Sequence, residues 1–302
     1  IADAVRLAQR AGISTVMITG DNELTAQAIG AEIGLLKRGD QVLTGAQFEL
    51  LSDTQAMKAL EKTRIFARTT PEQKYRIVSL LQKMGHVVAV TGDGVNDALA
   101  LKQSDVGVAM GITGTDVAKE AADMIITDDN YASLVVAIEE GRTIFDNIKS
   151  TTKYLIGCNL GEIGAITGGV LLGWPFILSP LHILYVNLVT DGLPAIGLSL
   201  TPKQGDIMTQ KPRTEKSIFN KHDVIWFIEV GLITTVATLI SFTIGSQESI
   251  TLGRTLAFLA IILAQQYIFY DIASRNKTIL KLSPKKFPWI LLPVVILIVQ
   301  IL

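Results

Sequence analysis

Long apolar stretches in the second half of the chain restrict the folds open to it. Four of them occupy residues 154–173, 176–198, 224–245 and 255–273. Each is about 20 residues long, the length that a helix needs to cross a bilayer. A fifth starts at Phe287 and is shorter, and the chain before about Ser150 is mixed and rich in charge. We therefore expect a soluble domain at 1–148 and a transmembrane domain at 149–302.

Basic residues alternate between the segments that join these stretches. The first segment has no Lys or Arg and the third has only Arg254, whereas the second and fourth are strongly basic. Their basic residues are Lys203, Lys211, Arg213, Lys216 and Lys221, then Arg275, Lys277, Lys281, Lys285 and Lys286. Because basic loops stay on the cytoplasmic side, this pattern predicts a multi-pass integral membrane protein with its soluble domain in the cytoplasm. Residues 142–153 have helical periodicity and read as a stalk into the first span.

The soluble half alternates apolar strands with amphipathic helices, which indicates a parallel sheet covered by helices. We expect helices at 1–11, 23–33 and 71–84, and strands at 14–18, 64–67, 86–90, 106–109 and 124–126. The segment 37–62 is less regular, and we expect it to be peripheral.

One acidic loop carries most of the functional signal. The run Thr91-Gly92-Asp93-Gly94-Val95-Asn96-Asp97-Ala98 directly follows an apolar strand. Glycines let the backbone approach a ligand closely, and Mg²⁺ is commonly held by one or two carboxylates together with phosphate oxygens. A β-turn that is acidic by chance is the alternative reading, but two aspartates, an asparagine and two glycines within so short a run favour a phosphoryl-transfer site, with Asp93 and Asp97 as Mg²⁺ ligands.

A second loop, Thr19-Gly20-Asp21, follows another predicted strand. Ligands bind at the carboxyl ends of parallel strands, so the Thr19 hydroxyl and the backbone N–H groups of Thr19 and Gly20 are candidates for holding phosphate oxygens. Lys74, early in the helix that starts at Pro71, is either a compact charge that neutralises phosphate or a solvated helix lysine.

The predicted spans contain acids that lipid disfavours. Glu162 and Asp191 lie inside spans, where a charge costs on the order of 3 kcal/mol and marks an ion or proton path. Spacing pairs Asn159 with Glu162 and Asn187 with Asp191 on shared helix faces. Gly192 and Pro194 are expected to break the second helix and free carbonyl oxygens. Together these groups are expected to form an oxygen cage suited to Ca²⁺. The alternative is a hydrogen-bond network of protonated acids between the helices. Gln265 is either a weaker, neutral ligand or a side chain that bridges two helices.

Other function classes are disfavoured. The net charge of −1 gives no reason to expect a nucleic-acid partner. The one cysteine, Cys158, and three widely separated histidines have no zinc-site spacing.

The motifs resemble those of the P-type cation-transporting ATPases, most closely the calcium-pump branch. The similarity runs from Ile1 to at least Ser199 and is weaker beyond. It is carried by Met17 to Asn22, Phe66-Ala67-Arg68 with Pro71 and Lys74, Thr91 to Ala98, Asp128-Asp129-Asn130 and Val186 to Pro194.

The resemblance implies an α/β, haloacid-dehalogenase-like phosphorylation domain with a Rossmann-type parallel sheet, followed by an all-α transmembrane bundle of helices five to about nine of the family. It implies ATP as substrate, Mg²⁺ as cofactor, Ca²⁺ as transported ion and the lipid bilayer as surroundings. Thr19, Gly20 and Asp21 would contact the aspartyl phosphate, Lys74 would steady it, and Asp93 would bind Mg²⁺ with support from Asn96 and Asp97. The cation ligands would be Asn159, Glu162, Asn187, Thr190 and Asp191.

Three departures from the family matter. No Asp-Lys-Thr-Gly-Thr occurs, so the nucleophilic aspartate and an amino-terminal half are missing, and we expect the fragment alone to be inactive. Leu99 replaces a usual proline, and Gln265 replaces a glutamate of the two-calcium pumps. A non-catalytic membrane regulatory or interaction protein remains the alternative of another class, and Mn²⁺, Na⁺ or H⁺ remain alternative cargoes.

Overall fold

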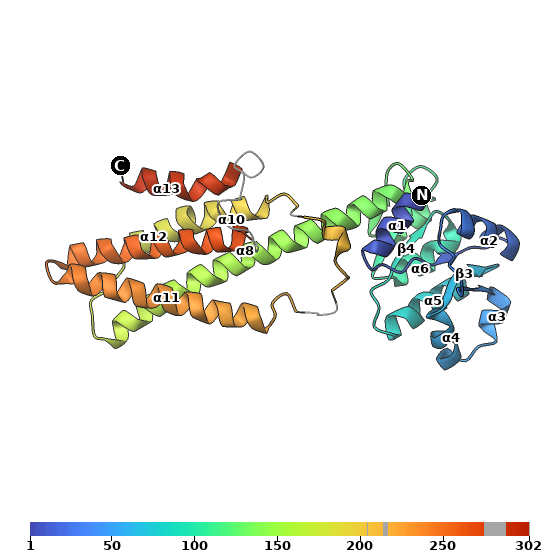
Figure 1. The fold of residues 1–302 in the computed structure, drawn as a ribbon, viewed down its shortest axis with the longest axis horizontal. Coiled ribbons are helices and arrows are strands. Elements are labelled where there is room, and N and C mark those ends of the chain that lie inside the picture. The colour runs from blue at the N-terminus through green and yellow to red at the C-terminus, as the bar shows by residue number, and fades with distance from the viewer. Residues whose placement is uncertain (204, 214–216, 275–287, 302) are drawn as a thin grey trace. The chain divides into compact units, whose positions relative to one another are not determined.

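The computed structural model describes residues 1–203, 205–213, 217–274 and 288–301. They form two compact units, Ile1–Glu140 with Asp206–Pro212, and Gly141–Gly205 with Arg213–Leu302. Figure 1 shows an α/β unit and a unit made of long helices.

The first unit begins with α1 (Ala2–Arg10) and contains six strands and the helices around them. In chain order the elements that follow are β1 (Met17–Ile18), α2 (Glu23–Glu32), β2 (Gln41–Thr44), α3 (Gly45–Glu49), α4 (Asp53–Leu60), β3 (Thr63–Ala67), α5 (Pro71–Lys83), β4 (Ala89–Gly92), η1 (Val95–Asp97), α6 (Ala98–Gln103), β5 (Val106–Met110), α7 (Asp116–Ala121) and β6 (Met124–Ile126). The helix α8 (Tyr131–Leu171) starts here and continues into the second unit.

The strands form two three-stranded parallel sheets, in the orders β1-β3-β2 and β4-β5-β6. This confirms the expected α/β class with parallel pairing. Two strands differ from their expected positions. β1 is shorter, at Met17–Ile18, and β4 is shifted toward the acidic loop, at Ala89–Gly92.

The expectation that 37–62 is irregular and peripheral is wrong. The segment contains β2, α3 and α4, and β2 pairs with the central strand β3. Phe48 from α3 is fully buried and packs edge-on against Phe66 of β3, with ring centroids 5.3 Å apart. This segment therefore forms part of the core on which the first sheet rests.

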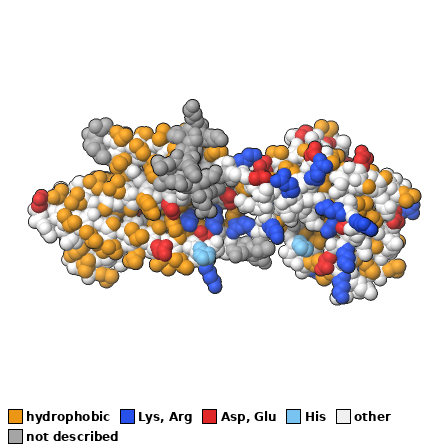
Figure 2. Space-filling view, in the orientation of Figure 1, with side chains coloured by type: hydrophobic (Ala, Val, Ile, Leu, Met, Phe, Trp, Pro, Cys, Tyr) orange, Lys and Arg blue, Asp and Glu red, His pale blue; other side chains and the backbone are white. Residues whose placement is uncertain are grey.

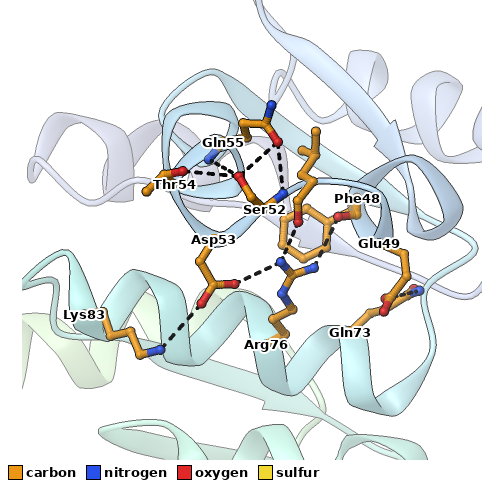
Figure 3. A network of polar contacts seen from close by, with 10 residues as sticks. Phe48, Glu49, Ser52, Asp53, Thr54, Gln55, Gln73, Arg76 and Lys83 are labelled. Atoms are coloured by element: carbon orange, nitrogen blue, oxygen red, sulfur yellow. Dashed lines mark hydrogen bonds and ion pairs between the residues drawn. The ribbon is translucent and has the colours of Figure 1, made fainter.

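Arg76 ties this segment to α5, as Figure 3 shows. Its guanidinium lies over the Phe48 ring, donates to the carbonyls of Phe48 and Leu51, and pairs with Asp53 at 2.9 Å. A cleft of about 600 Å³ runs beside it along α5. Because the Arg76 guanidinium already contacts the Phe48 ring, two carbonyl oxygens and the Asp53 carboxylate, we assign no ligand to this cleft.

The second unit is a helical bundle. Besides α8 it contains α9 (Pro180–Tyr185), the π-helical segment η2 (Val186–Asp191), α10 (Gly192–Ser199), α11 (Lys221–Ser246), α12 (Ile250–Ser274), η5 (Pro288–Leu291) and α13 (Leu292–Ile301). The short helix η3 (Ile207–Thr209) belongs to the first unit.

Among the residues that the structure describes, four helical segments are long and apolar enough to cross a membrane. Figure 2 shows hydrophobic side chains spread over the bundle surface. The four segments are Tyr131–Leu171, Pro180–Ser199, Lys221–Ser246 and Ile250–Ser274, in agreement with the first four expected spans. The fifth is present only as a shorter apolar helix, Pro288–Ile298. Lys216, Phe287 and the basic residues expected at 275–286 lie outside the described residues.

Glycines on α8 let α11 approach it closely. A Cβ atom at Gly161 would lie 2.6 Å from Cγ2 of Thr234, and one at Gly164 would collide with the Thr235 hydroxyl. The Thr235 hydroxyl donates to the carbonyl of Gly231 at 2.7 Å. Small residues that bring backbones together are a common basis for helix association in membranes.

The expected break at Gly192 and Pro194 is wrong. The chain stays helical, and the irregularity lies just before these residues, where η2 is wound as a π-helix. A π-helix bonds residue i to i+5, so the spacing of an α-helix does not hold across Asn187 and Asp191.

Candidate functional site

Two loops of the first unit present the residues expected to handle phosphate. Thr19 follows β1, and its backbone N–H donates to the carbonyl of Phe66 at 2.9 Å. Its carbonyl accepts from the backbone N–H and the hydroxyl of Thr69. Its own hydroxyl bonds to the Asp21 carboxylate at 3.0 Å, so Thr19 to Asp21 form a compact, braced turn that leaves Gly20 exposed.

Asp97 organises the acidic loop after β4. Its Oδ1 pairs with Nζ of Lys74 at 2.6 Å, and its Oδ2 accepts from the backbone N–H groups of Asp93 and Gly94 at 3.3 and 3.2 Å. A Cβ atom at Gly92 would lie 2.5 Å from Cβ of Asp97, so only glycine leaves room for this fold-back. Lys74 is mostly buried in the pair and is therefore not a freely solvated helix lysine.

The side chains of Asp93 and Asn96 are accessible to a ligand. Both are exposed, and neither side chain has a hydrogen-bond partner among the residues that the structure describes. The donor set fits Mg²⁺, which prefers carboxylate oxygen and keeps positions for water and phosphate. Asp93 would hold the ion, since the Asp97 oxygens already have three donors, and the ion would supply positive charge beside a phosphate.

In the bundle, three polar side chains meet away from solvent. Glu162 on α8, Asp191 at the end of η2 and Gln265 on α12 are 5%, 1% and 1% exposed. Gln265 donates from Nε2 to Oε1 of Glu162 at 2.9 Å. Both oxygens of Asp191 are buried without a hydrogen-bond partner within the described ranges. Unpaired buried acceptors are costly, and a hydrogen-bond donor or a hard cation would be needed to satisfy the Asp191 carboxylate.

Thr190 and Tyr154 support this cluster. The Tyr154 hydroxyl donates to the Thr190 carbonyl at 2.8 Å, and the Thr190 hydroxyl donates to the Val186 carbonyl at 2.9 Å. Tyr154 was not among the candidates from sequence, although it lies two turns before Glu162 on the same face of α8. Its bond to η2 holds the π-helical backbone next to the acids.

The structure does not bring Asn159 and Asn187 into the cluster. Both are exposed, and each donates to the carbonyl four residues earlier on its own helix, Leu155 or Ile183. The expectation that Asn187 and Asp191 share a buried helix face is wrong, because Asn187 is exposed whereas Asp191 is buried. Asn159 is likewise exposed where Glu162 is buried. Across the described part of the chain, no group of three or more His, Cys, Asp or Glu is arranged to hold a metal.

Comparisons with known proteins agree with both halves of this description. Residues 175–302 match the family described as cation transporting ATPase, C-terminus, and residues 1–105 and 75–138 match haloacid dehalogenase-like hydrolase families. The chain is 41% identical over 301 residues to calcium-transporting ATPase 1 of Bacillus cereus, covering 94% of this chain and 34% of that protein.

Two further relatives are similar at this level. The calcium-transporting ATPase of Bacillus subtilis is 43% identical over 280 residues, covering 91% of this chain and 32% of the relative. The endoplasmic reticulum calcium ATPase srcA of Aspergillus fumigatus is 45% identical over 247 residues, covering 80% and 25%. The chain therefore spans about a third or less of the length of these relatives.

Proposed function

The chain belongs to the cation-transporting P-type ATPases, and we propose that it is the carboxyl-terminal part of an ATP-driven calcium pump. The buried acids of the bundle carry this proposal. Within the described part of the chain, neither carboxylate oxygen of Asp191 has a hydrogen-bond partner, and Glu162 accepts from the neutral amide of Gln265. A hard divalent cation is the ligand that such oxygens favour, and the relatives are named as calcium transporters.

The first unit would perform phosphoryl transfer with a segment that the chain does not contain. An aspartate of that segment would attack the γ-phosphate of ATP and form an aspartyl phosphate. Lys74 and the backbone N–H of Gly20 would offset the charge that develops on the phosphate oxygens. The backbone N–H of Thr19, also expected to hold phosphate, instead donates to the Phe66 carbonyl. Asp93 would hold Mg²⁺, while Asp97 keeps the Asp93 loop and Lys74 in place.

Open strand edges support the need for a further segment. Among the described strands, β1 pairs only with β3, and β4 pairs only with β5. Ala89 and Thr91 on β4 are exposed, and Val87 just before it is 84% exposed. Parallel sheets are normally covered on both faces, and an exposed strand edge can pair with a further strand, so a strand carrying the nucleophilic aspartate would fit at these edges.

The test is phosphoenzyme formation from ATP in the longer protein that carries this chain. Label that is stable in acid, sensitive to hydroxylamine and dependent on micromolar Ca²⁺ is expected, and Asp191→Asn should abolish this Ca²⁺-dependent label. Glu229→Gln is the matched control, because Glu229 is an exposed acid of α11, and it should behave like the unmodified protein.

Other outcomes point elsewhere. Label that depends on Mn²⁺, Na⁺ or H⁺ instead of Ca²⁺ would move the cargo to that cation. No label from a folded full-length protein would leave the non-catalytic membrane protein as the better description.

A further inference from the structure

Asp129 connects two loops of the first unit by an unusual arrangement. It lies two residues before α8 in a left-handed backbone conformation, with φ of 50°. Its carboxylate accepts from the backbone N–H groups of Ile112 and Thr113 at 2.9 and 2.7 Å, and from the Thr113 hydroxyl at 2.7 Å. Strained backbone persists where the surrounding contacts fix it, and here three donors from the loop after β5 do so.

The loop that Asp129 holds also touches the acidic loop after β4. The backbone N–H of Thr115 donates to the carbonyl of Asp93 at 2.8 Å. The loop has little room to move between these ends. A Cβ atom at Gly111 would lie 2.7 Å from the Ile126 carbonyl, and one at Gly114 would collide with the Met110 carbonyl. This close packing supports a coupling between the two ends of the loop.

The neighbouring acid has a different set of partners. Asp128 accepts from the Ser133 hydroxyl at 2.7 Å and from the Asn130 backbone N–H at 3.2 Å. Both partners belong to the start of α8 and the residue before it, so Asp128 stabilises the helix start locally. Of the two adjacent carboxylates, Asp129 is the one that reaches the 111–115 loop.

We propose that Asp129 is a positioning residue that couples the start of α8 to the backbone of Asp93 through the 111–115 loop. The chemistry at Asp93 rests on the proposed function, whereas the connection itself is a property of this chain. A shift of the Asp93 main chain passes to Thr115 and then to Asp129, which gives α8 a route to the acidic loop that is shorter than the covalent path through β5 and β6.

The first experiment measures residue-resolved hydrogen exchange in the full 302-residue chain without metal, comparing Asp129→Asn with Asp128→Asn. Asparagine tolerates the left-handed backbone conformation of residue 129. The substitution therefore removes the negative charge and one acceptor oxygen without straining the backbone. Exchange should rise about tenfold at Ile112 and Thr113 in Asp129→Asn, because charged hydrogen bonds are lost. It should also rise at Thr115, whose amide Asp129 does not touch.

The control variant should leave Thr115 unchanged and affect only residues 130–133. Thr113→Val removes one of the three donors to Asp129 and should give a smaller rise at Thr115, which keeps the test usable if Asp129→Asn folds poorly. Unchanged exchange at Thr115 in Asp129→Asn, or an equal rise in Asp128→Asn, would overturn the proposal.

The second experiment uses Mn²⁺ as the probe and electron paramagnetic resonance to measure its affinity. The signal of interest is the bound fraction that Asp93→Asn removes. Asp129→Asn should lower the Mn²⁺ affinity of this fraction about threefold, and Asp128→Asn should leave the affinity unchanged. The expected loss is smaller than the roughly 10- to 100-fold loss typical when a direct partner of a metal ligand is removed. Unaltered affinity in Asp129→Asn would overturn the positioning role. If the unmodified chain has no bound fraction that depends on Asp93, the Mg²⁺ assignment of the proposed function fails, and the exchange at Thr115 alone decides the role of Asp129.

Discussion

The ammonium of Lys74 lies 2.6 Å from Oδ1 of Asp97 and joins the first turns of α5 to the end of the acidic loop. The two aspartates of that loop consequently have different roles. The Asp97 carboxylate is bound by the Lys74 ammonium and by two backbone N–H groups, whereas the Asp93 carboxylate is exposed and free to bind a ligand. The pair also links the two sheets, because α5 follows β3 while Asp97 follows β4.

Replacing Lys74 should loosen the acidic loop. In Lys74→Met, Oδ1 of Asp97 loses its ion pair with Lys74 while remaining mostly buried. The free energy of opening measured by hydrogen exchange at the Gly94 amide should fall by about 1–3 kcal/mol. Lys83→Met is the control on the same helix, since its pair with Asp53 is more than half exposed and is screened by solvent, so the Gly94 amide should exchange as in the unmodified chain. Equal effects of the two substitutions would contradict this reading of the pair.

Gln265 should set the strength of cation binding in the bundle. Gln265→Glu places a second carboxylate beside Glu162, which costs stability in EGTA and adds an anionic ligand when Ca²⁺ binds. The rise in thermal midpoint on adding Ca²⁺ should therefore exceed that of the unmodified chain, with affinity higher by about tenfold. Gln265→Leu leaves Glu162 without its 2.9 Å partner and should lower the midpoint in EGTA. A smaller Ca²⁺ response in Gln265→Glu would contradict a shared site.

The glycines of α8 should differ sharply in their tolerance of alanine. Gly161→Ala brings a methyl group to 2.6 Å from Thr234 on α11 and should destabilise the bundle by about 1–3 kcal/mol. Gly141→Ala, on the same helix, meets nothing within 4 Å and should stabilise it by about 0.5–1 kcal/mol. Thermal unfolding in detergent compares them, and midpoint shifts of the same sign would rule out close packing at Gly161.

Acid should release the 111–115 loop. The backbone N–H of Ile112 is the main cause that lowers the pKa of Asp129 to about 2; partial desolvation opposes it and the Thr113 donors add to it. Because the folded pKa lies below the ordinary value of 3.8, the stabilisation is complete above about pH 4 and disappears as the pH falls toward about 2. Carbon-13 NMR of the Asp129 carboxyl should follow this titration. A midpoint near 3.8 would mean that the three hydrogen bonds do not hold in solution.

Much of the fold follows from periodicity. The helices at α1, α2 and α5 and the four long apolar segments matched expectation because each buries one regular face or spans a bilayer. The segment 37–62 was misjudged because its elements are short. Its signal was nevertheless present, since Thr44 with Gln47 and Ser52 with Gln55 have the spacing of capping boxes and start α3 and α4.

The site was only partly predictable for a related reason. Strand ends placed Thr19 and Asp93 correctly, but the partners of Asp97 and Asp129 come from loops that the fold alone brings together. Helical spacing also misplaced Asn187, which is exposed where Asp191 is buried, because spacing pairs residues on a helix without saying which of them the neighbouring helices cover.

The π-helical segment η2 also determines where this chain tolerates a change in length. A π-helix takes up more residues per turn than an α-helix, so removing one residue between Val186 and Asp191 lets the backbone rewind as an ordinary helix. The side chains of α10 then keep their directions relative to α9. The same deletion within α9 or α10 would rotate every later side chain by about 100° around the axis. Single-residue deletion scanning that is scored by folding should therefore find its permissive position in η2, whereas loss of Thr190 or Asp191 should still remove cation binding.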